Sequence, residues 1–70
     1  MNVRDVIQKA RLDLPTLARM TGGRIRLPFL KQLSRGAKDA NPEHRTALAR
    51  AFRRHAATLA ALADRLDPTE

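Results

Sequence analysis

Side chains that perform covalent chemistry are sparse in this sequence and are not grouped. The chain has no cysteine, its two histidines, His44 and His55, lie eleven positions apart, and Ser34 has no identifiable base. The seven acidic residues are scattered, with no close pair inside an apolar stretch. Nucleophilic catalysis, catalysis by paired carboxylates and metal binding each need such a group. We therefore expect no enzyme, no cofactor and no metal site.

The remaining chemistry is the attraction of anions by fixed positive charge. The net charge is +7, and it is concentrated between residues 19 and 54, where ten Lys and Arg face two acidic residues. A positive field of this kind attracts a nucleic acid, an anionic membrane surface or an acidic protein. The alternative is a well-solvated surface without a partner.

The length and the first residues limit the organisation of the protein. Seventy residues hold one domain, 1–70, with a small core that gains stability from a partner. Residues 1–14 carry charges every few positions, so they resemble neither a signal peptide nor a membrane span. The absence of cysteine fits a reducing compartment. We expect a cytoplasmic protein.

The spacing of apolar residues predicts helices and no strand. Prolines near the starts and glycines after the ends mark three short segments with helical periodicity. The predicted short helices are 3–11, 15–21 and 27–35. Asn41, Pro42 and Glu43 then start a long helix, or two helices with a slight break near 54–57. The predicted fold class is all-α, a small bundle of four to five helices with a long C-terminal helix.

A heptad seam follows the last predicted helix. Its members are Leu48, Phe52, His55, Leu59, Leu62 and Leu66. The alanine-rich end of this helix can be a stable helix that packs into the monomer core. It can also be a subunit interface, which we favour because a short chain has little core to cover so many apolar positions. We predict a dimerisation helix at about 55–66, with interface residues His55, Leu59, Leu62, Ala63 and Leu66.

Two short helices joined by a tight turn with glycine, inside a small basic chain, have the outline of a helix-turn-helix. Over about residues 3–54 the sequence resembles the lambda-repressor/Cro-like helix-turn-helix family. The matching residues are Leu17, Ala18, Gly22, Ile25, Leu30, Leu33, Arg35, Gly36, Asn41 and Pro42. The turn is two residues longer than is usual in the family, because Gly23 and Arg24 intervene. Arg26 stands where the family commonly has a capping Ser or Thr.

The resemblance implies that the turn holds a DNA phosphate. Gly22 and Gly23 let the chain reverse and bring backbone amides close to a phosphate. Arg24 and Arg26 add positive charge at the start of the next helix. The residues expected near the DNA backbone on either side are Arg19, Arg35 and Lys38.

The resemblance also implies that the outer face of the helix at 27–35 reads bases in the major groove. Gln32 can pair with adenine and Lys31 with guanine. Leu27 and Pro28 can contact only a thymine methyl group or fill space. This sparse set predicts modest selectivity, or discrimination that depends partly on DNA shape.

The function expected from these features is that of a homodimeric, sequence-specific regulator of transcription that binds double-stranded DNA. The resemblance favours a repressor at an inverted-repeat operator, encoded by a bacterium, a phage or a mobile element and associated with the nucleoid. A second hypothesis is an interaction protein of the antitoxin or anti-activator type, whose apolar C-terminal helix binds a protein partner. A third is a protein that coats nucleic acid without sequence preference.

Overall fold

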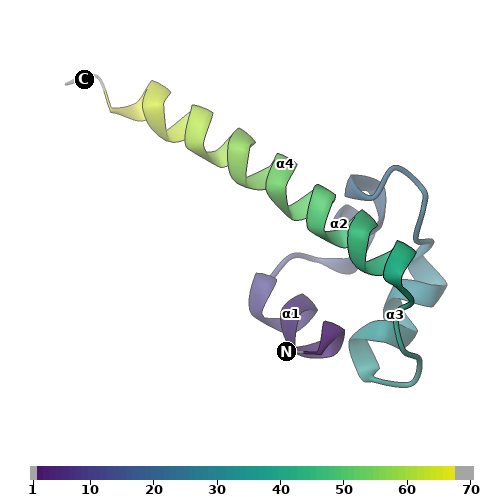
Figure 1. Cartoon of the computed structure of the whole chain (residues 1–70). Coiled ribbons are helices and arrows are strands. Elements are labelled where there is room, and N and C mark those ends of the chain that lie inside the picture. Colours follow the sequence, from purple (N-terminus) through teal and green to yellow (C-terminus); the bar gives the residue numbers. More distant parts are fainter. Residues whose placement is uncertain (1, 68–70) are drawn as a thin grey trace.

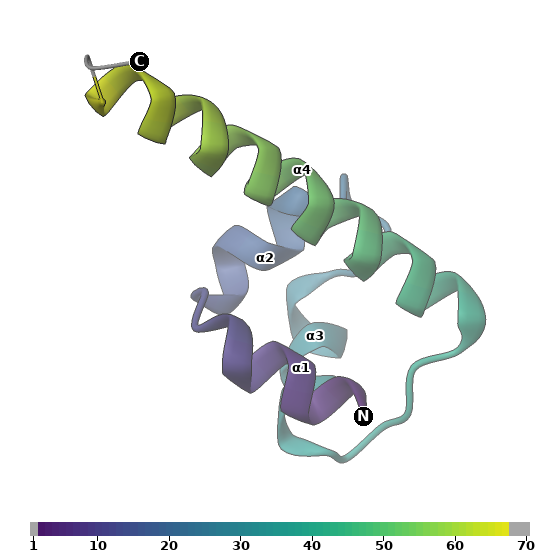
Figure 2. The same ribbon diagram turned by 60° about the vertical axis from the view of Figure 1, so that its left-hand side comes forward.

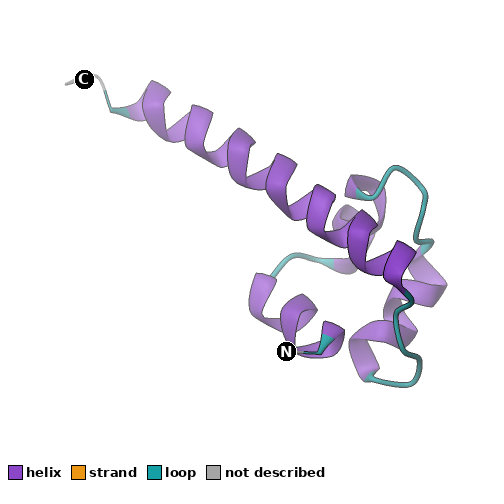
Figure 3. Cartoon of the chain, in the orientation of Figure 1, coloured by secondary structure: helices purple, strands orange, loops and turns teal. Residues whose placement is uncertain are grey.

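Four helices follow one another along the chain (Figures 1 and 3). The computed structural model describes residues 2–67; Met1 and residues 68–70, which belong to the predicted domain 1–70, lie outside the described residues. The helices are α1 (Val3–Ala10), α2 (Leu14–Met20), α3 (Leu27–Arg35) and α4 (Pro42–Leu66). No strand occurs in the described part of the chain. The predicted all-α fold with a long C-terminal helix is confirmed, and α4 is a single helix without a break.

Side-chain caps and left-handed residues set the helix bounds within one residue of the prediction. Oδ1 of Asn2 accepts a hydrogen bond from the Asp5 amide at 2.8 Å and caps α1. This helix ends at Ala10 because Arg11 adopts the left-handed conformation, with φ of 55°. Gly36, with φ of 78°, ends α3 in the same way, as its sequence position predicts.

The core lies where α3 contacts both α1 and α2, and where α2 contacts α4. Its buried members are Ile7, Leu17, Ile25, Leu30, Leu33, Ala47 and Leu48. Leu17 and Leu30 are completely buried, so α2 and α3 are joined through the centre of the core. A tightly packed interior resists changes of even one methylene group, and this core therefore fixes α3 relative to α2.

The second half of α4 extends away from the other helices (Figures 1 and 2). The buried residues of α4 are Ala47, Leu48 and Ala51, all in its first half. Every residue from Ala56 to Asp67 is exposed. We call residues 2–55 the body and residues 56–67 the arm; the arm gives the molecule its longest dimension of 46 Å, against 20 Å in the other two directions.

Candidate nucleic-acid interface

A set of exposed cations covers α2, α3 and the segments that follow them. We call it the cationic surface, and its members are Arg19, Arg24, Arg26, Lys31, Arg35 and Lys38. All six side chains are exposed. The sequence from Leu14 to Lys38 contains no acidic residue, so no neighbour along this stretch neutralises them. The stretch is therefore strongly positive, although Asp13 lies near Arg19 and Glu43 lines two hollows together with Arg24.

Arg19 is held on the outer side of α2 by a short chain of hydrogen bonds. Its Nη2 donates to the hydroxyl of Thr16 at 3.4 Å, and that hydroxyl donates to Oδ2 of Asp13 at 2.8 Å. The hydroxyl and the amide of Thr16, the latter at 3.1 Å, hold the pKa of the Asp13 carboxyl below its ordinary value. Asp13 thus caps α2 as an anion while Arg19 remains directed along the helix surface.

Thr21 fixes the turn between α2 and α3. It is 2% exposed, the one buried polar residue among those described. Its hydroxyl oxygen accepts from the Ile25 amide at 3.2 Å and lies 2.7 Å from the Ala18 carbonyl, to which it donates. The Ile25 carbonyl lies farther away, at 3.3 Å. Because Ile25 is itself buried, these bonds fasten the far end of the turn to the end of α2.

The two glycines shape the turn, with φ of 68° at Gly22 and 82° at Gly23. An added Cβ would meet no atom within 4 Å at either position, so the need for glycine is conformational. The Gly22 amide donates to the Arg19 carbonyl at 3.0 Å, and the Arg24 amide donates to the Thr21 carbonyl at 3.3 Å. These two amides are engaged inside the protein, and the side chains of Arg24 and Arg26 are exposed.

The start of α3 differs from the starts of the other helices. Asn2, Asp13 and Asn41 each cap a helix through a side-chain oxygen, whereas Arg26, at the cap of α3, makes no such bond. The amides of the first helical turn have no partner within a helix. In α3 the second of these positions is Pro28, which has no amide hydrogen, so the amides of Leu27 and Phe29 and the charge of Arg26 are the groups there that attract an anion.

The face of α3 that points away from the core carries the predicted reading residues. Leu30 and Leu33 are buried, as predicted, and Pro28, Lys31 and Arg35 are exposed. These three lie on one side of the helix, because they are three and four positions apart. Leu27 and Gln32 are half-buried, at the margins of this face. Lys31 and Arg35 therefore dominate the open surface, and Gln32 contributes from its edge.

His44 was given no role by the sequence, yet it links α4 to α3. Its Nδ1 accepts a hydrogen bond from the Asn41 amide at 3.2 Å, and its own amide donates to Oδ1 of Asn41 at 2.8 Å. The imidazole also lies beside the ring of Phe29, with the two ring centres 4.7 Å apart. The position three residues after an Asn cap, usually Glu or Gln, is the signal that could have found this capping box.

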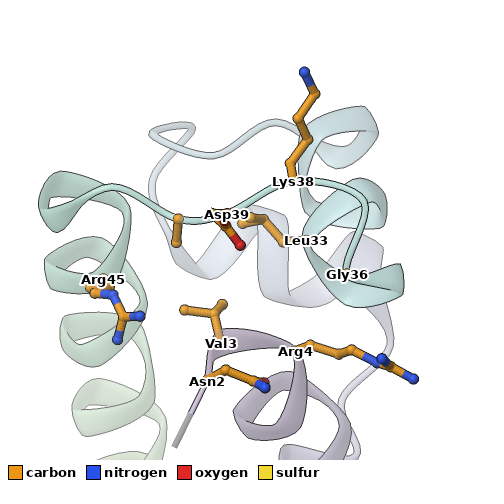
Figure 4. Close-up of a pocket in the computed structure, with 9 residues that line it drawn as sticks. Asn2, Val3, Arg4, Leu33, Gly36, Lys38, Asp39 and Arg45 are labelled. Atoms are coloured by element: carbon orange, nitrogen blue, oxygen red, sulfur yellow. The ribbon is translucent and has the colours of Figure 1, made fainter.

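A hollow of about 230 Å³ lies between the start of α1, the end of α3 and the loop before α4 (Figure 4). Arg4, Lys38 and Arg45 line it, but so does the carboxylate of Asp39. Figure 4 shows Lys38 directed away from the other labelled side chains. The hollow is mixed in charge, and we assign it no ligand.

The five predicted interface residues lie on one half of α4. His55 is half-buried against the body, whereas Leu59, Leu62, Ala63 and Leu66 are exposed. The leucines are 52%, 46% and 83% exposed, in chain order. The seam thus divides: Leu48 and Phe52 contact the core, His55 is half-buried, and Leu59, Leu62 and Leu66 are exposed.

Further findings concern the chain as a whole. Residues 2–67 contain no group of three or more His, Asp or Glu that could hold a metal ion. None of the described helices is both long enough and apolar enough to cross a membrane. Comparison with protein-family models, with curated proteins and with solved structures finds no match. Function is therefore inferred from the geometry and charge of this chain itself.

Proposed function

We propose that this protein is a sequence-specific regulator of transcription that binds double-stranded DNA, and that it acts as a homodimeric repressor. Helix α3 enters the major groove, as in the lambda-repressor/Cro-like family that the sequence resembles. No catalytic step and no cofactor belongs to this proposal. The proposed site of action is the bacterial nucleoid in the cytoplasm, as for regulators of phages and mobile elements.

The observation that carries the proposal is the cationic surface. Six exposed cations and no acidic residue lie between Leu14 and Lys38, the stretch that forms α2, the turn and α3. DNA presents a dense row of phosphates, and each cation that neutralises one releases a counterion. The core fixes α3 against α2, and the buried Thr21 hydroxyl fastens the turn between them. Both features support a rigid orientation of α3 on a row of phosphates.

Two kinds of contact follow from the positions of the side chains. Arg24 and Arg26 hold a phosphate at the start of α3, and Arg19, Arg35 and Lys38 contact the backbone on either side. Lys31 and Gln32 contact base edges. With Leu27 and Pro28 apolar, sequence preference is modest and depends also on DNA shape.

A second candidate function is favoured by the exposed leucines of the arm. A protein of the antitoxin or anti-activator type would cover Leu59, Leu62 and Leu66 with a protein partner, and DNA binding would be secondary. The mass in solution separates the two proposals. The 7.8 kDa chain is a stable dimer alone in the first case and a monomer until the partner is added in the second.

Titration of a labelled DNA duplex with the purified protein at several salt concentrations tests the proposal. We expect binding that is tighter to a duplex than to a single strand of the same length, and that weakens steeply as salt rises. Equal affinity for the single strand and the duplex would favour a coating protein. No binding to the duplex at low salt would refute the proposed function.

A further inference from the structure

The arm carries an apolar stripe that nothing in the monomer covers. Leu59, Leu62 and Leu66 follow His55 at spacings of four, three and four, so the four side chains lie along one side of α4. All three leucines are exposed, and Figure 1 shows the arm clear of the other helices. An ordered row of exposed leucines on a helix indicates a covered surface in the working assembly.

We propose that the arm pairs with the arm of a second copy in antiparallel orientation, centred between Ala60 and Ala61. In this register Leu59 faces the partner's Leu62, and His55 faces the partner's Leu66. The heptad spacing permits this register. A heptad seam has two apolar positions, and in an antiparallel pair the residues at one position pack against the partner's residues at the other. This inference rests on the homodimer of the proposed function and adds its geometry.

The charge distribution favours the antiparallel orientation over the parallel one. Residues 2–55 carry thirteen Lys and Arg against four acidic residues, a net charge of +9, whereas residues 56–67 carry a net charge of −1. A parallel pair would set the two basic bodies side by side. An antiparallel pair sets the two bodies at opposite ends of the paired arms and brings the C-terminal end of each arm, the negative end of its helix dipole, to the partner's basic body.

The surface beside His55 has room for the end of a second arm. A hollow of about 230 Å³ lies there between the end of α2 and α4. Its lining residues are Arg19, Met20, Gly22, Ala51, Arg54, His55 and Thr58. In the proposed register the partner's Leu66 lies opposite His55 beside this hollow, where Met20 and Ala51 offer apolar contact. Leu66, at 83% exposed, is the leucine with most surface to bury.

Small residues beside the stripe allow the two helices to approach closely. Ala56 and Ala63 lie on one side of it, and in the proposed register each faces the other of the partner subunit. With a rise of 1.5 Å per residue, the centres of the two buried α4 segments (Ala47–Ala51) lie about 35 Å apart along the helix axis in this dimer.

Cysteine cross-linking tests this register, because the natural chain contains no cysteine. The variant with both His55→Cys and Leu66→Cys is expected to form an interchain disulfide dimer as its main oxidised product. Each single variant is expected to stay monomeric on a non-reducing gel, like the collision control Ala57→Cys on the opposite side of α4. The two cysteines lie about 16 Å apart within one helix and cannot bridge there.

A second double variant, Thr58→Cys with Arg65→Cys, tests the same register at exposed positions. It shows whether a result from the first variant is caused by the loss of His55 or Leu66 alone. Failure of both double variants to cross-link while circular dichroism shows intact helices would overturn the proposal. Efficient cross-linking of the Leu66→Cys single variant would also overturn it, since only a parallel pair brings the two Leu66 positions together. A monomeric natural chain in sedimentation at micromolar concentration would do the same.

These measurements contain no DNA, so the two proposals can fail separately. A chain that cross-links as expected but does not bind a duplex would refute the proposed function and leave the antiparallel pairing in place. A chain that binds an inverted repeat but cross-links through single cysteines would refute the pairing and leave the function in place.

Discussion

The hydroxyl of Thr21 accepts a hydrogen bond from the amide of Ile25 at 3.2 Å, across the turn that joins α2 to α3. Both residues are buried, although the glycines and the arginine between them are exposed. The turn between α2 and α3 is thereby fastened at both ends, which supports a fixed position of α3 relative to α2.

Replacement Thr21→Val is expected to destabilise the fold by about 1–3 kcal/mol, because the buried Ile25 amide loses its partner and the Ala18 carbonyl loses one of its two donors. Urea denaturation followed by circular dichroism measures this. Thr21→Ser keeps the hydroxyl and serves as the control, with a smaller loss. Equal losses for the two variants would show that the methyl group matters and the hydrogen bonds do not.

Replacement Arg24→Ala or Arg26→Ala is expected to weaken binding to all duplex sequences and to lower the slope of log affinity against log salt by about one for each phosphate that the variant no longer neutralises. Fluorescence anisotropy at several salt concentrations measures both quantities. Lys9→Ala, which removes an exposed cation of α1, is the matched control. If affinity and slope are unchanged in both arginine variants, the phosphate contact at this turn is wrong.

Replacement Gln32→Ala is expected to relax the preference at one base pair, at a cost of about 1–3 kcal/mol for the preferred base. Competition among operator variants that differ at single positions measures it. Arg35→Ala, on the neighbouring exposed position, should instead weaken all variants alike. An unchanged preference profile in Gln32→Ala would remove Gln32 from the reading face.

Replacement Leu59→Asp is expected to dissociate the dimer and to reduce operator affinity by about 100-fold, since binding through two linked half-sites is lost. Sedimentation and anisotropy measure the two effects. Ala57→Asp places the same charge on the opposite side of α4 and should leave the dimer intact. A dimer that survives Leu59→Asp would move the interface away from the arm.

The lowered pKa of Asp13 predicts a contribution to stability that is lost in acid. Because the folded-state pKa lies below the unfolded value of about 3.9, the stabilisation is present above that pH and is lost as pH falls through the folded-state pKa. Asp13→Asn keeps a capping oxygen and is expected to flatten this part of the pH dependence in thermal denaturation. Thr16→Val, which removes the donor hydroxyl, should flatten it too. A pH profile identical to that of the natural chain in both variants would contradict the assignment.

Local sequence signals predict the helices well because their causes are local. Asn41 followed by Pro42 starts α4, and Gly36 ends α3, through backbone preferences that a single residue carries. An anchored helix needs no new nucleus, so the alanine-rich arm continues α4 beyond its last buried residue. This explains the single helix where a break near 54–57 was the alternative.

The parts that sequence reasoning missed depend on contacts between segments. Thr21 looks like an ordinary polar residue before two glycines, and its burial depends on Ile25 folding back onto α2. His44 acquires its role only once Asn41 caps α4 and Phe29 lies beside the imidazole ring. The arm leucines are exposed, and nothing among the described residues covers them, so their role is a matter of proposal.

Sequence-specific DNA binding is best tested by selection from a random pool of double-stranded DNA with the purified protein near physiological salt, followed by sequencing of the bound fraction. We predict enrichment of an inverted repeat whose half-sites are centred about 34 Å, or one turn of DNA, apart. A bound fraction with no enriched sequence, released as salt rises, would contradict the proposed function and leave only electrostatic attachment.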